Sequence, residues 1–151
     1  MTNRTTLTPK LLTINGSIVN MLNDGTQMTA VDNTNGMSVP ITTNSIPAGA
    51  DIDRLILLVL NTNAAGRTVT VRAGTADGGA TKTGAGTQGL PNIPFLGGKG
   101  DLTFSAMTAT TGIGIFGPFE IARFIQPDNT LSIDFSGATG FIAAILLPRA
   151  F

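Results

Sequence analysis

The sequence predicts an all-β fold, namely a single β-sandwich or jelly-roll-like domain. Thr, Gly, Val and Ile are abundant, whereas Glu and Lys, which favour helices, are scarce. No window sustains a 3.6-residue apolar stripe beyond two turns. Short segments of alternating apolar and polar residues recur instead between turn signals, as in sandwiches and jelly rolls. The 151 residues have the length of one domain.

The predicted sandwich covers residues 37–151 and begins with a strand at 37–42. Met37, Val39 and Ile41 alternate with other residues, so one face of this strand is expected to be buried. Pro40 has no backbone N–H to donate to a neighbouring strand. It therefore predicts an edge strand or a bulge.

Two further strands are predicted before residue 74. Residues 54–60 are apolar on both faces after Arg54, which is typical of a central strand covered on two sides. Residues 68–72 alternate, with Val69 and Val71 expected to point inward.

Residues 74–100 predict a long loop of different character. Nine of these 27 residues are Gly, so burial alone is not expected to offset the entropy of ordering them. Loops of this length within a domain are usually functional or disordered. Leu90, Ile93 and Phe95 near its end suit a loop that packs on a partner.

The last third has the clearest strand pattern. Residues 102–104 alternate, and residues 113–120 predict a strand that ends at a Gly-Pro corner. After a turn at 127–129, residues 131–135 predict a half-buried strand. Residues 141–147 predict a buried closing strand.

Residues 1–36 are polar with scattered apolar side chains and predict an N-terminal arm. Two interpretations stay open. The arm adds a further strand or frays, or it lies on a neighbouring chain and pairs with a strand there. Under the second interpretation its contacts include Leu7, Leu11, Leu12 and Ile14.

The residue inventory argues against an enzyme. The chain has no His, Cys, Trp or Tyr, and Glu120 is its one Glu. Histidine bases, cysteine nucleophiles and His or Cys zinc sites are therefore excluded. We expect no cofactor, no bound metal and no small-molecule substrate.

Charge and hydropathy point to assembly. Only 12% of residues are charged, the formal net charge is zero, and the mean hydropathy is +0.28. Such a surface favours association over free diffusion. The cations are dispersed, so nucleic acid is not an expected partner. No apolar run is long enough to span a bilayer, and no signal peptide is recognisable, so no membrane partner is expected.

Two glycine-rich motifs and two carboxylate pairs fail as sites. Residues 84–89 match GxGxxG, but the prolines that follow exclude the required helix. Residues 97–100 lack the Ser or Thr of a phosphate loop. Asp51 and Asp53 have no further calcium ligands at the needed spacing.

Glu120 and Asp134 could form a glycosidase pair, but aromatic platforms for a sugar are scarce. A structural ion pair between Glu120 and Arg123 is the simpler expectation.

From residue 46 onward the chain resembles the decoration or cement proteins of tailed-bacteriophage heads. The resemblance is carried by these segments: Ile46–Gly49, Leu55–Thr62, Arg67–Gly74, Gly117–Glu120, Arg123–Gln126, Asp128–Phe135 and Leu147–Pro148. It implies a β-sandwich that forms homotrimers on the outer surface of the virion capsid, binds the major capsid protein and joins neighbouring capsomers. It also implies synthesis in the host cytoplasm. A tail, fibre or other adhesion module, with or without glycan binding, stays open as the alternative, and a Ser- and Asp-based hydrolase ranks last.

Overall fold

The computed structural model describes residues 4–18, 28–40, 52–73, 101–107, 112–119, 121–124, 126 and 129–148. Within them, ten strands alternate with only two short helical segments, η1 (Ile52–Arg54) and α1 (Ile121–Phe124). The all-β prediction is confirmed. Expectations for residues 1–3, 19–27, 41–51, 74–100, 120 and 127–128 lie outside the described residues.

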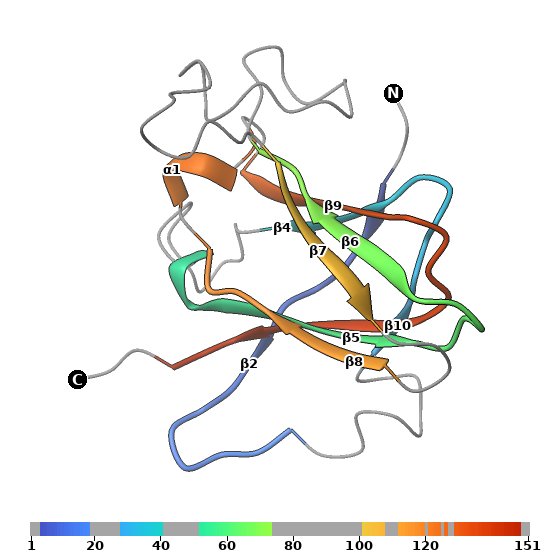
Figure 1. The fold of residues 1–151 in the computed structure, drawn as a ribbon. Coiled ribbons are helices and arrows are strands. Elements are labelled where there is room, and N and C mark those ends of the chain that lie inside the picture. Colours follow the sequence, from blue (N-terminus) through green and yellow to red (C-terminus); the bar gives the residue numbers. More distant parts are fainter. Residues whose placement is uncertain are drawn as a thin grey trace.

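The strands form two sheets, which Figure 1 shows as two layers. The first sheet has the order β1-β4-β9-β6-β7. Its strands are β1 (Thr5–Thr6), β4 (Met37–Pro40), β9 (Thr130–Phe135), β6 (Arg67–Val71) and β7 (Leu102–Met107). All its described pairings are antiparallel except that of β1 with β4.

The second sheet has the order β2-β10-β5-β8, and β3 also pairs with β10. Its strands are β2 (Lys10–Leu11), β3 (Thr29–Ala30), β5 (Leu55–Asn61), β8 (Gly112–Phe116) and β10 (Gly140–Leu146). From β3 onward, the order of neighbouring strands across the sheet is β3-β10-β5-β8 in this sheet and β4-β9-β6-β7 in the other. Successive connections therefore pass repeatedly from one sheet to the other.

One apolar core lies between the sheets. Alternate residues of each strand point into it, as period-two patterning requires. Leu57 and Val59 enter from the second sheet and meet Val69 and Ile133 from the first, all with no exposed surface. The rings of Phe104 on β7 and Phe116 on β8 stack 4.4 Å apart and join the sheets at one edge.

The predicted strands agree with the structure where it is described. Pro40 is the last residue of β4 and lies beyond the two residues that pair with β1. Its missing N–H therefore removes no described ladder bond on that side. β4 itself lies between β1 and β9 and pairs with β9 in regular register, so the predicted edge strand or bulge is not found. In β5, however, Leu55, Leu57 and Val59 are buried whereas Ile56, Leu58 and Leu60 are only half-buried. The expected cover on the second face of this strand is therefore incomplete.

Candidate partner-binding surface

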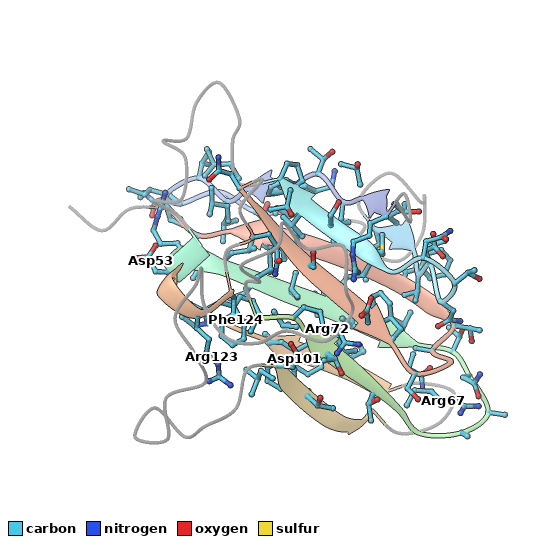
Figure 2. The ribbon with its side chains drawn as sticks, turned by 90° about the horizontal axis from the view of Figure 1, so that it is seen from above. Asp53, Arg67, Arg72, Asp101, Arg123 and Phe124 are labelled. Carbon is cyan, nitrogen blue, oxygen red and sulfur yellow. The ribbon has the colours of Figure 1, made fainter. Side chains whose placement is uncertain are left out.

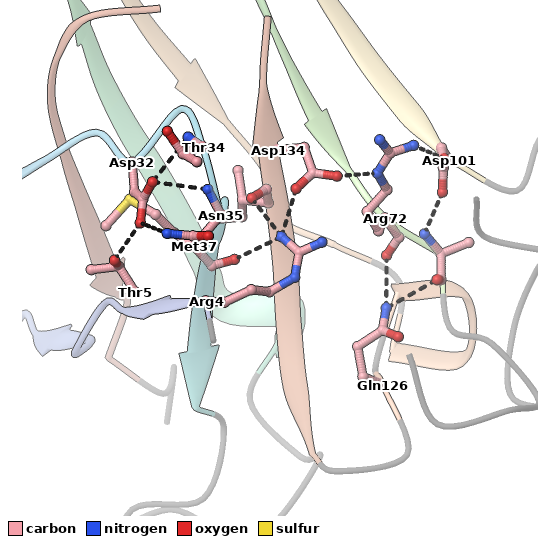
Figure 3. A network of polar contacts seen from close by, with 12 residues as sticks. Arg4, Thr5, Asp32, Thr34, Asn35, Met37, Arg72, Asp101, Gln126 and Asp134 are labelled. Carbon is pink, nitrogen blue, oxygen red and sulfur yellow. Dashed lines mark hydrogen bonds and ion pairs between the residues drawn. The ribbon is translucent and has the colours of Figure 1, made fainter. Parts of the chain in front are cut away.

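A network of charged side chains lies on the outer side of the first sheet, centred on Asp134 of β9 (Figure 3). Arg4 donates from Nη1 to one oxygen of Asp134 at 2.6 Å, and Arg72 donates from Nε to the other oxygen at 2.6 Å. Arg72 also donates from Nη1 to Asp101. Both oxygens of Asp134 are therefore occupied by guanidinium groups.

The electrostatics of the network follow from these contacts. Burial favours the neutral form of Asp134, but the hydrogen bonds and positive charges of Arg4 and Arg72 outweigh it and lower the pKa of this carboxyl group. For Arg72, burial opposes the charge, but hydrogen bonds to Asp101 and Asp134 outweigh it and raise the pKa of the guanidinium group. Asp134 is therefore held ionised as an acceptor.

The same network closes the base of the 74–100 segment. The backbone N–H of Ala73 donates to Oδ1 of Asp101 at 2.9 Å. Gln126 donates from Nε2 to the carbonyl oxygens of Ala73 at 2.9 Å and Arg72 at 3.2 Å. In Figure 2, Arg72 and Asp101 face each other across the ends of β6 and β7. The residues immediately before and after the segment are thus held together.

Hydrogen bonds also hold Thr5, near the start of the described chain, to the turn at Asp32. Thr5 donates from Oγ1 to Asp32 at 2.7 Å, and the N–H groups of Thr34 and Asn35 donate to the other oxygen of Asp32. The bonds from the Asn35 backbone and from Thr5 lower the pKa of Asp32 to about 2. The turn that Asp32 organises leads into Gly36, whose φ is +73°.

Gly36 permits the approach of Arg4 to Asp134. A Cβ atom at this position would lie 2.3 Å from Nη1 of Arg4 and 2.4 Å from Oδ1 of Asp134. No side chain can occupy that space without displacing the ion pair. Glycine at position 36 is therefore required both by the backbone angle and by the network.

The described arm residues lie on the chain's own sheets. β1 pairs with β4 and β2 pairs with β10, in each case in parallel, and β3 pairs with β10 in antiparallel fashion. Residues 5–6, 10–11 and 29–30 therefore form additional strands within the same chain, as the first interpretation of the arm predicts.

Of the expected arm contacts, Leu7 requires a correction. It is 2% exposed and belongs to the core, because the bond from its N–H to the carbonyl of Ser38 draws it between the sheets. Leu12 is half-buried, with its N–H bonded to the carbonyl of Leu146. Leu11 and Ile14 are 57% and 49% exposed and remain available to a partner.

The expected loop contacts Leu90, Ile93 and Phe95 lie outside the described residues, as do both glycine-rich motifs. The alternation pattern of the sequence did not single out Ile113, Ile115 and Phe141, which are large and exposed. A signal for them exists in the order Ile-Gly-Ile on β8, where the large residues alternate with glycine rather than with polar residues.

No catalytic arrangement is found among the described residues. Asp134 is fully engaged, Glu120 and Asp51 are outside them, and Asp53 is exposed in η1. The guanidinium group of Arg123 lies 4.7 Å from the ring centre of Phe124, and the two side chains lie side by side in Figure 2. Arg123 also donates to the carbonyl oxygen of Asp101. Within the same ranges, no group of three potential metal ligands occurs.

No helix in the described part of the chain is long and apolar enough to cross a membrane. Comparisons with protein-family models, with curated proteins and with solved structures give no match for this chain.

Proposed function

We propose that this chain is a decoration protein that binds the outer surface of a tailed-phage capsid and stabilises the head lattice. The observation that carries the proposal is the network around Asp134. It holds both segments proposed to contact the capsid: Arg4 at the start of the N-terminal arm, and Arg72 with Asp101 at the base of residues 74–100. One network of ion pairs thus joins the described residues at the ends of both segments.

The strand order supports this role. We interpret the orders β3-β10-β5-β8 and β4-β9-β6-β7 as those of an eight-stranded jelly roll, an architecture used by viral capsid domains. A fold by itself does not establish a function. Two further observations favour binding over chemistry: the chain has no His or Cys, and arginines engage both oxygens of Asp134.

The mechanism of such a protein is binding energy rather than chemistry. Contacts that exist only on the assembled lattice favour that lattice by mass action. Copies that bridge several major capsid protein subunits, as homotrimers would, gain further affinity from multivalency. A chain with zero net charge meets little electrostatic repulsion from its neighbours at high surface density.

The test uses Leu11 and Ile14, because both side chains are exposed and neither belongs to the core. Deleting residues 1–20 would also remove Arg4 and Leu7 and so damage the fold. The L11S/I14S variant is instead incubated with heads that lack this protein, and L11M/I14V serves as the control that keeps the apolar surface.

Binding is measured by co-sedimentation with the heads. We expect L11S/I14S to bind at least about tenfold more weakly than the unaltered protein, and L11M/I14V to bind like the unaltered protein. Equal binding of the Ser and control variants would remove the arm from the proposal. Failure of the unaltered protein to bind heads would contradict the decoration role itself and favour a tail or fibre part.

A further inference from the structure

The outward side of the second sheet is apolar across β10, β5 and β8. Residues paired across antiparallel strands share a face. The pairings place Phe141, Leu60 and Ile113 in one row across β10, β5 and β8, and Ala143, Leu58 and Ile115 in the next. We call these six residues the outer apolar face. None of them carries a charge or a side-chain hydrogen-bonding group.

The outward side of the first sheet has the opposite character. Its strands present Thr70 paired with Thr103 and with Asp134, and Ser38 paired with Ser132. The hydroxyl groups of Thr70 and Thr103 lie 3.0 Å apart and form a hydrogen bond. Sheets in contact with water on one side show this polar outer face. The outward sides of the two sheets therefore differ in chemistry, polar on the first and apolar across β10, β5 and β8 on the second.

In strand β8 the small residues face the core and the large residues face outward. Gly112 and Gly114 share the inward side of the strand, while Ile113 and Ile115 point outward with 57% and 69% of their surfaces exposed. A Cβ atom on Gly114 would lie 2.3 Å from the ring of Phe116, so the core side is already filled. A half-buried strand normally has the reverse arrangement. The large apolar residues of β8 thus lie on the outer side of the sheet rather than in the core.

The exposed area matches the apolar centre of a protein interface. At about 200 Å² for a large apolar side chain, the outer apolar face exposes about 400 Å². A stable interface buries about 800 Å² on each partner, roughly 60% of it apolar. The face therefore supplies most of the apolar area that one such interface needs.

We propose that a second copy of this chain packs on the outer apolar face. A face without charge or polar groups offers nothing for a charged partner to recognise, whereas an identical face is chemically matched to it. Ile113 and Ile115 on β8 and Phe141 on β10 supply the large exposed side chains of this face, whereas Ala143 is 1% exposed. The formal net charge of zero leaves no long-range repulsion between copies.

Sedimentation velocity on the purified full chain tests this proposal without any phage head, so its outcome is separate from that of the decoration role. We expect self-association in the range of about 1–100 µM. The I113T/I115T variant keeps strand-favouring residues at exposed sites and should raise the dissociation constant about tenfold or more. The matched L11T/I14T variant removes the same kind of exposed surface elsewhere and should change it less than about twofold.

A chain that stays monomeric at about 100 µM would overturn the proposal, as would equal effects of the two variants. A second measurement does not depend on the double variant. The chain has no Cys, so I115C introduces a single thiol. Its maleimide labelling should slow as protein concentration rises, while that of I14C should not. Slow labelling of I115C at every concentration would mean that a segment of the same chain covers the face, and fast labelling at every concentration that nothing does; either result contradicts the proposal.

Discussion

Replacing Asp134 with Asn tests whether the network holds the fold together. The carboxylate is 12% exposed and accepts two hydrogen bonds of 2.6 Å, from Arg4 and Arg72, which are 15% and 23% exposed. Removing one partner of a buried ion pair costs about 3–5 kcal/mol, whereas an exposed pair contributes about 0–1 kcal/mol. The intermediate exposure of these groups places the expected loss of unfolding free energy at about 2–3 kcal/mol.

Urea unfolding followed by far-ultraviolet circular dichroism measures this loss, because the chain has no Trp or Tyr for fluorescence. The midpoint should fall while the slope with urea stays the same. Thermal unfolding should shift down by about 5–10 °C in a domain of this size. D53N is the matched control, since it removes the same charge from an exposed helical turn and should cost less than about 0.5 kcal/mol. A D134N variant as stable as D53N would refute the reasoning.

Three further predictions concern stability. The pKa values of Asp134 and Asp32 are lowered in the folded chain, so their stabilisation is present above the unfolded pKa of about 3.9 and is lost as pH falls through the lowered pKa of each group, which for Asp32 is about 2. The urea midpoint should therefore be lower at pH 3 than at pH 6, and an equal midpoint would contradict the assigned hydrogen bonds. G36A should cost more free energy of unfolding than G137A, although both glycines have positive φ, because a Cβ at 137 meets no atom closer than 3.4 Å. Equal losses in urea unfolding would show that crowding at Gly36 is unimportant. L57A should cost about 2–5 kcal/mol in the same assay, because this side chain has no exposed surface, and a loss below about 1 kcal/mol would contradict its place in the core.

The core strands could be predicted from the sequence because their signal is local. In β9, alternation alone identifies Leu131 and Ile133 as inward residues, and both are buried. In β6 the same pattern identifies Val69 and Val71. Period-two burial is a property of each strand by itself, so no knowledge of its neighbours is needed.

The polar network and the arm could not be predicted in this way. Arg4 and Asp134 are 130 positions apart, and the pairings of β1 with β4 and of β4 with β9 bring them together. The sequence predicts a partner contact for Leu7 because a single apolar residue in a polar segment carries no periodic signal. Its burial depends on the two-residue strand β1, which is too short to be recognised from sequence. The outward direction of Ile113 and Ile115 likewise depends on the register of β8 with β5.

The copy number of this chain in purified virions from its source, relative to the major capsid protein, tests the decoration role most directly. A protein that covers the head lattice is expected at a ratio near one to one. A handful of copies per virion would contradict the decoration role in favour of a tail or vertex part. Complete absence from the virion would contradict both structural roles.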